Sequence, residues 1–399
     1  MYLSLSGRKR TGFISACVAV ILYTTYTLAC GFYSNRVLQE DLVPSVVIEV
    51  PDEALRPDSE NVALHNPSDA HESPTKIEAP RPVGIGTANA TMVMLARNDE
   101  IDGVLSSMAT VENRFNREHG YPWTFLNEVE FTEEFKSRVK NATSAHVSFG
   151  LIPDEHWSQP NWIDEVMATK GRKKMAQAKI IYADNVPYRN MCRFNSGFFY
   201  KQPILQQYRY YWRVEPNVRI MCDVKFDPFD YLRDNNKIYG FTIAFTEWEK
   251  TIPTLWSTVK EFMVKHPEYV NEDNALGFLS DNKGKTYNLC HFWSNFEIAD
   301  MNFWRSEAYE KFFDYLENRG GFYYERWGDA PVHSIAAALF APKEQLHFFR
   351  NIGYRHEPFQ HCPSGADYEG LNCECKAGDG LDYAPQSCIR RYENLFSGK

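Results

Sequence analysis

One glutamate, Glu297, lies in the middle of the aromatic segment CHFWSNFEIADMNFWRSEAY, residues 290–309. A carboxylate among aromatic rings is costly unless it is paired, hydrogen-bonded or used in chemistry. Two interpretations stay open. Glu297 is a structural carboxylate paired with an arginine such as Arg305. Alternatively, it faces an oxocarbenium-like centre, where it stabilises positive charge or attacks the anomeric carbon of a sugar while aromatic walls exclude water.

Further carboxylates and imidazoles lie in polar stretches surrounded by apolar residues. Oxygen ligands, sometimes with one imidazole, suit Mg²⁺ or Mn²⁺, and a carboxylate just past a strand end is well placed to hold such an ion against a diphosphate. The candidates for this metal site are Glu215, Asp223, Glu247, His333 and His356. For each of them the alternative is a structural ion pair or a satisfied core histidine.

Candidates for substrate binding come from the other polar stretches. YRNMCRFNSGFFY holds Tyr188 and Arg189, and Arg213 lies in YYWRVEP. Asp329 opens GDAPVHSIAAALF, which is typical of a helix start with Asp329 as N-cap and Pro331 in the first turn. The same helix N-terminus could instead face an anion.

Composition and periodicity predict an α/β domain. The chain has 399 residues, 44% of them apolar, and a net charge of −9, which disfavours a nucleic-acid partner and requires any phosphate site to be built locally. ATMVMLA, WTFLNEV and AHVSFGLI indicate strands, while residues 101–115, 251–267 and 306–321 indicate helices. This alternation favours a mainly parallel sheet that binds ligands at the carboxyl ends of its strands. The chain lacks a G-x-G-x-x-G or Walker motif, which disfavours a dinucleotide or P-loop enzyme.

The N-terminal region differs from the rest. After Arg8, Lys9 and Arg10, an uncharged apolar stretch predicts a transmembrane signal-anchor over residues 13–32, with a cleavable signal peptide as the alternative. Residues 1–12 would be cytoplasmic. Residues 33–85, rich in Pro, Ser and acidic residues, predict a disordered lumenal stem, and residues 86–399 predict the catalytic domain. Two sequons, at Asn89 and Asn141, agree with a lumenal domain.

Nine cysteines add a further constraint. In an oxidising lumen several of the seven beyond the anchor should pair, and the odd count leaves at least one free or intermolecular. Cys362, Cys373, Cys375 and Cys388 resemble a zinc site only loosely, so disulfides are preferred.

Together, YRNMCRFNSGFFY, YYWRVEP, CHFWSNFEIADMNFWRSEAY and GGFYYERWGDAPVHSIA closely resemble the fungal α-1,2-mannosyltransferases of glycosyltransferase family 15, over residues 88–392. The resemblance implies a GT-A-like fold, GDP-mannose as donor and Mn²⁺ as cofactor. It also implies a type II Golgi membrane protein that adds α-1,2-mannose, with retention of configuration, to O-linked and N-linked glycans of secretory glycoproteins.

The resemblance also assigns roles to residues. Glu297 matches the glutamate proposed as nucleophile, Tyr188 a donor-site tyrosine, and His356 the histidine associated with the metal. Glu247 lies where another metal-site carboxylate is expected. Glu215 begins the tripeptide that stands in for the D-x-D motif of other GT-A enzymes.

This tripeptide departs from the family pattern. The family usually has Glu-Pro-Asp, whereas residues 215–217 are Glu-Pro-Asn. Because the other motifs are intact, we expect residue 217 to lie outside the direct metal ligands, with substitution by Asp223 or a weak or inactive homologue as alternatives. A glycoside hydrolase and a carbohydrate-binding module are the competing classes. Neither the acceptor nor the choice between double displacement and front-face attack follows from the sequence.

Overall fold

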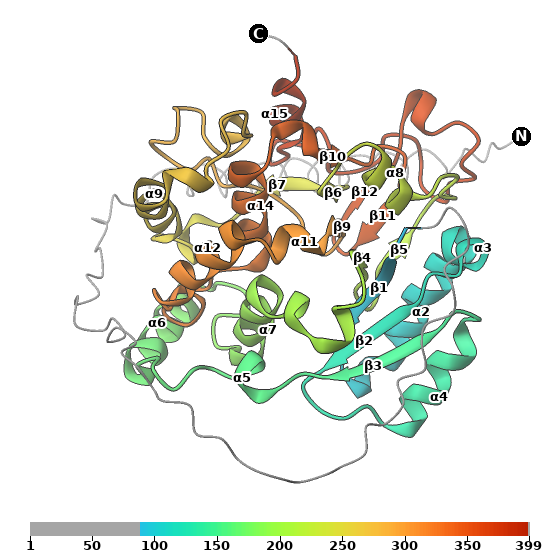
Figure 1. The fold of residues 1–399 in the computed structure, drawn as a ribbon, viewed down its shortest axis with the longest axis horizontal. Coiled ribbons are helices and arrows are strands. Elements are labelled where there is room, and N and C mark those ends of the chain that lie inside the picture. Colours follow the sequence, from blue (N-terminus) through green and yellow to red (C-terminus); the bar gives the residue numbers. More distant parts are fainter. Residues whose placement is uncertain (1–87, 398–399) are drawn as a thin grey trace, which may run out of the picture. The chain divides into compact units, whose positions relative to one another are not determined.

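The computed structural model describes residues 88–397 (Figure 1). Its centre is a seven-stranded sheet that combines segments from the whole described region. Across the sheet the strands are β10 (Leu346–Phe348), β6 (Tyr239–Phe241), β9 (Glu297–Asp300), β4 (Tyr210–Arg213), β1 (Ala90–Leu95), β2 (Trp123–Asn127) and β3 (Val147–Leu151).

One strand runs against the other six. β9 pairs antiparallel with both β4 and β6, whereas the remaining neighbours in the sheet pair in parallel. The prediction of a mainly parallel sheet is therefore confirmed. The reversed direction of β9 has a consequence for the site, because its first residue, Glu297, pairs with Arg213, the last residue of β4. Glu297 thus lies at the edge where the parallel strands end, which is where α/β sheets bind ligands.

Both faces of the sheet are covered. Side chains alternate along β1, so Met92 and Met94 pack in one core cluster and Val93 in another. The first cluster lies under α2 (Ile101–Val111) and α4 (Glu133–Ala142). The second lies under helices that gather on the other side of the sheet in Figure 1, namely α7 (Val186–Gly197), α9 (Leu255–Lys265), α12 (Glu307–Glu317) and α14 (Asp329–Phe340).

The remaining elements are short or peripheral. The other helices are α3 (Arg117–His119), α5 (Asp154–Trp157), α6 (Glu165–Gln177), α8 (Pro228–Asp234), α10 (Leu276–Leu279), α11 (Met301–Trp304), α13 (Gly321–Tyr324) and α15 (Ile389–Asn394). A three-stranded sheet combines β12 (Phe359–His361), β11 (Tyr354–His356) and β5 (Arg219–Ile220), and β7 (Ala244–Thr246) pairs with β8 (Cys290–Phe292).

The predicted helices form with small shifts at their ends. The helix predicted over residues 251–267 begins at Leu255, so Pro253 precedes it rather than opening its first turn. The helix predicted over residues 306–321 is α12, whose N-cap Ser306 accepts a hydrogen bond from the Tyr309 N–H. Gly320, with φ of +67°, follows it in the left-handed conformation that glycine adopts most readily.

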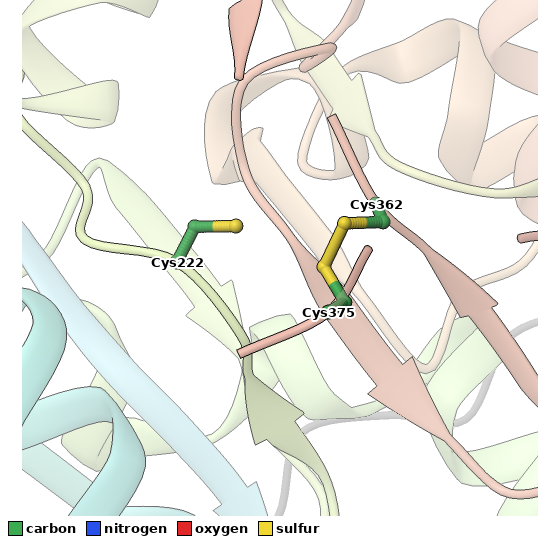
Figure 2. A group of neighbouring side chains, drawn as sticks. All are labelled: Cys222, Cys362 and Cys375. Carbon is green, nitrogen blue, oxygen red and sulfur yellow. A yellow bond between two sulfur atoms is a disulfide. The ribbon is translucent and has the colours of Figure 1, made fainter. Parts of the chain in front are cut away.

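Three disulfides form among the predicted cysteines: Cys222–Cys373, Cys290–Cys388 and Cys362–Cys375. Figure 2 shows Cys362 joined to Cys375 with Cys222 close by. These three sulfurs are the one group within residues 88–397 that meets the spacing of a three-ligand metal site. All three are in disulfides, and so are Cys373 and Cys388, so the zinc alternative for Cys362, Cys373, Cys375 and Cys388 is wrong. Cys192 is free and buried, as the odd count predicted for one cysteine.

The predicted tail, anchor and stem lie outside the described residues, as do residues 86, 87, 398 and 399 of the predicted catalytic domain. Among the helices of residues 88–397, none has the length and apolar character needed to cross a membrane.

Candidate functional site

A cleft of about 830 Å³ opens where β1 and β4 end, and it brings together most of the predicted site residues. Leu95 ends β1 and Arg213 ends β4, so the cleft lies at the carboxyl edge that the fold class predicts. The predicted residues that line it are Tyr188, Arg213, Glu215, Glu247, Asp329 and His356.

Arg213 is the cationic centre of this cleft. Its Nη1 lies 2.5 Å from Asp329 Oδ2, and its Nη2 donates to Glu215 Oε1. The Ser294 hydroxyl also donates to Asp329, at 2.7 Å. Burial opposes the charge of Asp329, but the charges of Arg213 and His333 and these hydrogen bonds outweigh it and hold the pKa of that carboxyl below its usual value. Arg213 therefore balances the charge of Asp329 and also lines the cleft.

The N-cap prediction for Asp329 is wrong. Helix α14 begins at Asp329 itself, with Gly328 as N-cap and no capping hydrogen bond from a side chain. The carboxylate turns instead to Arg213, because an ion pair with a buried guanidinium is stronger than a cap. Pro331 lies in the first turn of α14, as predicted.

His356 and Glu215 form a pair of metal-ligand type on one side of the cleft. The His356 Nδ1–H donates to the Glu357 carbonyl at 3.1 Å, and Nε2 lies 3.7 Å from Glu215 Oε2. Asn295 also donates to this Glu215 oxygen. An imidazole whose outer nitrogen is fixed by a carbonyl is the arrangement that orients histidine ligands.

Glu247 is a further possible ligand that lines the same cleft, but Glu215, Glu247 and His356 do not meet the spacing of a three-ligand metal site in this structure. Glu247 Oε1 accepts the Trp248 N–H at 2.7 Å and lies 4.0 Å from Arg326 Nη2. Two carboxylates and one imidazole fit the preference of Mn²⁺ for oxygen ligands with some nitrogen. His356 and Glu247 are the freer pair, because both oxygens of Glu215 already accept hydrogen bonds.

Glu297 lies beneath the cleft rather than on its surface. It is only 1% exposed, and it borders a small space of about 20 Å³ that shares Asn195, Arg213 and Glu215 with the cleft. Two tyrosine hydroxyls and one imidazole nitrogen contact the carboxylate, and each comes from a different element. They are Tyr211 Oη at 2.6 Å, Tyr239 Oη at 3.0 Å and His333 Nδ1 at 3.0 Å.

The predicted alternative partner of Glu297 is wrong. The Arg305 guanidinium donates to the backbone carbonyls of Tyr208 and Leu205, at 3.0 and 2.9 Å, and to that of Tyr200 at 3.4 Å. Arg305 follows α11, whereas the carboxylate of Glu297 points to the core cluster under α14. Glu297 is thus a buried carboxylate held by hydroxyls and an imidazole.

Three candidates do not join the cleft. Asp223 pairs with Arg114 at 2.7 Å and Lys225 at 2.9 Å, so it is a structural ion-pair residue and not a replacement metal ligand. Arg189 is fully buried, and its guanidinium donates to the carbonyls of Glu325, Tyr182 and Asn185, which removes it from the donor-binding candidates. His333 lies behind Glu297 and is not a metal candidate.

Asn217 lies outside the cleft as expected. It adopts a left-handed conformation with φ of +66°, its N–H donates to the Gly103 carbonyl at 3.1 Å, and its side chain lies against Gly103. Asparagine and aspartate are the non-glycine residues that tolerate this conformation best. The departure from Glu-Pro-Asp therefore changes a turn beside α2 and removes no carboxylate from the cleft wall.

Two cleft residues were not assigned from the sequence. Arg326 is 7% exposed, its guanidinium lies 5.3 Å from the Tyr188 ring centroid, and its Nε lacks a hydrogen-bond partner within the described residues. His291 of β8 is 2% exposed, and its Nδ1 is likewise unpartnered there. Buried polar atoms of this kind usually have partners. The sequence signal for Arg326 was its position in the polar stretch YYERWGDAPVHS. That position did not distinguish Arg326 from the other polar residues of the stretch as a binding residue.

The two predicted glycosylation sites are exposed. Asn89 directly precedes β1 and donates to the Gln207 carbonyl at 2.7 Å, and Asn141 lies in the last turn of α4. Their glycosylation stays a prediction.

Comparisons with known proteins agree on one family. The family described as glycolipid 2-alpha-mannosyltransferase matches residues 51–397. The glycolipid 2-alpha-mannosyltransferase of Saccharomyces cerevisiae is 51% identical over 308 residues, which cover 77% of this chain and 70% of that protein. The O-glycoside alpha-1,2-mannosyltransferase omh1 of Schizosaccharomyces pombe is 50% identical, covering 77% of this chain and 79% of that protein.

Solved structures show the same similarity. The mannosyltransferase Ktr4p from S. cerevisiae in complex with GDP has a TM-score of 0.75 and 40% identity, covering 82% of this chain and 87% of that one. Core-mannan synthase A from Aspergillus fumigatus, in its Mn/GDP form, has a TM-score of 0.74 and 39% identity, covering 86% and 93%. The fold is that of a GT-A-like glycosyltransferase. The chain belongs to glycosyltransferase family 15 and is an α-1,2-mannosyltransferase.

Proposed function

We propose that this enzyme transfers mannose from GDP-mannose, with Mn²⁺ as cofactor and with retention of configuration, to mannose residues on O-linked or N-linked glycans of secretory glycoproteins. The observation that supports the proposal is the cleft, whose lining includes Glu247, Glu215 and His356 and which adjoins the small space that the buried Glu297 borders. The solved relatives bind GDP, and one of them binds it with Mn.

In this proposal, Glu247 and His356 hold the Mn²⁺ ion, with Glu215 supporting His356 or adding an oxygen. When bound, the ion neutralises the diphosphate that leaves. Arg326 supplies the direct cationic contact with the phosphates. Its buried Nε is unpartnered within the described residues, and its nearest carboxylate oxygen, on Glu247, lies 4.0 Å away. Tyr188 packs between Arg326 and Tyr182, whose ring is 4.5 Å away and nearly parallel, which fixes the wall against which the donor binds.

Glu297 acts at the anomeric carbon. In double displacement, its carboxylate attacks the carbon opposite the leaving diphosphate, and the acceptor hydroxyl then displaces it, so that configuration is retained. In front-face attack, the same carboxylate stabilises the oxocarbenium-like charge and forms no bond. Because Glu297 is almost fully buried, the donor sugar has to enter beside Asn195, Arg213 and Glu215, which line both the cleft and the small space next to Glu297.

The location is proposed from the sequence alone. A basic N-terminus, an apolar stretch over residues 13–32 and a Pro-rich segment fit a single-pass type II protein of the Golgi membrane with a lumenal catalytic domain. Such a protein meets mannosylated glycoproteins during secretion, which is the acceptor class proposed here.

The test is GDP release from GDP-mannose by the purified chain with methyl α-mannoside as acceptor, in Mn²⁺ and in EDTA. The anomeric configuration and linkage of the product are read by NMR. Acceptor-dependent and metal-dependent release with an α-1,2 product is expected. Release without acceptor would indicate donor hydrolysis, and GDP binding without any release would indicate an inactive homologue. Either outcome would overturn the proposal.

A further inference from the structure

His333 is a fully buried histidine beside the proposed catalytic carboxylate. It lies on α14 with 0% exposure, and both of its ring nitrogens have partners. Nδ1 lies 3.0 Å from Glu297 Oε2, and Nε2 lies 3.0 Å from the Asn195 carbonyl oxygen. A carbonyl oxygen only accepts hydrogen bonds, so Nε2 must carry a hydrogen.

The other nitrogen then determines the proton count of the pair. If His333 were neutral with its hydrogen on Nε2, the Nδ1 lone pair would face a carboxylate oxygen at 3.0 Å, and two acceptors at that distance repel. One more proton must therefore lie between Nδ1 and Oε2. It belongs either to an imidazolium beside a carboxylate or to a neutral imidazole beside a carboxylic acid.

The hydrogen bonds around Glu297 favour the carboxylate. Trp304 Nε1–H, which can only donate, donates to Tyr211 Oη at 3.0 Å, so the hydroxyl hydrogen of Tyr211 is free to bind Glu297 Oε1 at 2.6 Å. Tyr239 donates to Oε2 at 3.0 Å. Both oxygens thus accept from hydroxyl donors, which stabilises the ionised form.

The surroundings of His333 favour the imidazolium. Its ring stacks on Trp304, with centroids 4.2 Å apart and planes 23° from parallel, and an indole face attracts a cation. Its Nε2 partner, Asn195, lies in the last turn of α7, where the free carbonyls of a helix also favour positive charge. The other charged or titratable groups near the pair are Arg213, Asp329 and Tyr309.

We infer that His333 is the positioning residue of Glu297, and that it holds the shared proton as an imidazolium that orients the carboxylate toward the anomeric carbon. The inference rests on the catalytic role proposed for Glu297. His333 does not touch the donor, and it acts through the carboxylate. Because the shared proton lies on His333, Glu297 is already ionised. No separate base is required to remove a proton from its carboxyl group.

The first test counts protons in the full-length protein labelled with ¹⁵N-histidine. At pH 7–8 both ring nitrogens of His333 should give imidazolium signals, assigned by their loss in His333→Asn. In Glu297→Gln the same residue should become neutral, because the amide no longer requires the proton. A neutral His333 in the wild type would overturn the inference, and so would an imidazolium that persists in Glu297→Gln.

The second test is kinetic and has a matched control. His361 is also buried, at 2% exposure, with Nδ1 at 2.7 Å from Asp382 Oδ2 and Nε2 at 3.1 Å from the Arg350 carbonyl, but it does not line the cleft. His333→Asn should lower kcat roughly 10²-fold, the typical result of misplacing a catalytic group, with the KM for GDP-mannose within about twofold.

His361→Asn should lose a similar amount of thermal stability and keep kcat within about threefold. Equal losses of kcat in the two variants, or unchanged kcat in His333→Asn, would contradict the positioning role. If the wild type released no GDP, the proposed function would fail, whereas the ¹⁵N spectra would still decide the protonation of His333.

Discussion

Replacing Arg213 with methionine tests the charge arrangement of the cleft wall. The Arg213 side chain is 11% exposed and that of its partner Asp329 is 8% exposed, and their nearest atoms are 2.5 Å apart. Removing one partner of a buried pair leaves an uncompensated charge and costs about 3–5 kcal/mol. For a domain of this size that loss lowers Tm by about 6–10 °C, measured by differential scanning calorimetry at pH 7.

The size of this effect has an internal control. Arg209 pairs with Asp300 at 2.9 Å, but the Arg209 side chain is 52% exposed, so Arg209→Met should cost less than about 1 kcal/mol. The double variant Arg213→Met with Asp329→Asn should recover more than half of the lost stability. It removes the negative charge of Asp329, which Arg213→Met alone leaves buried without its partner.

The pH dependence follows from the sign of the Asp329 shift. Its folded pKa lies below the unfolded value, so its stabilising contribution is present above about pH 3.9 and is lost as pH falls through the folded pKa. In Arg213→Met the carboxyl protonates more readily, so the stability gap to the wild type should narrow between pH 7 and pH 4. A gap below about 1 kcal/mol at pH 7, or one that stays constant with pH, would refute the reasoning.

Three further predictions concern the metal, the turn and the disulfides. His356→Ala should raise the Mn²⁺ concentration for half-maximal GDP release by about tenfold or more, and an unchanged Mn²⁺ titration would remove His356 from the site. Asn217→Asp should leave kcat/KM within about twofold, because residue 217 lies outside the cleft; a large gain would show that it contributes there. Replacing both Cys290 and Cys388 with alanine should lower the free energy of unfolding by about 2–5 kcal/mol, read by denaturant titration, because their bond closes a loop across a sequence separation of 98.

Much of the fold was accessible from the sequence because its signals are local. The apolar runs at β1, β2 and β3 and the periodic residues of α2 each report on their own segment. The reversal of β9 was not accessible. Strand direction depends on which neighbours pair, and β9 pairs with β4 and β6, which lie far away in the sequence.

In the site, too, some features could be predicted from the sequence and others could not. Motif similarity selected Tyr188, Glu247 and His356, which the structure brings into one cleft. Sequence proximity suggested Arg305 for Glu297, but that arginine bonds to backbone carbonyls, and the carboxylate instead meets Tyr211 and Tyr239 from two other strands.

Long-range pairing explains the other corrections. Asp223 pairs with Arg114, which lies 109 residues away, and no pattern in the sequence joins the two. His333 was indistinguishable from a metal ligand until α14 placed it against β9. Residues whose partners come from distant elements can be identified as polar and unusual, but their partners require the tertiary structure.

The central claim is that Glu297 carries the chemistry and leaves donor binding to other residues. Glu297→Gln preserves the shape of the side chain and removes its charge. The measurement compares kcat for GDP release with the Kd for GDP in Mn²⁺. We predict a loss of kcat of at least roughly 10³-fold with a Kd within about threefold of the wild type. Turnover within about tenfold of the wild type would contradict the claim and make Glu297 a packing residue.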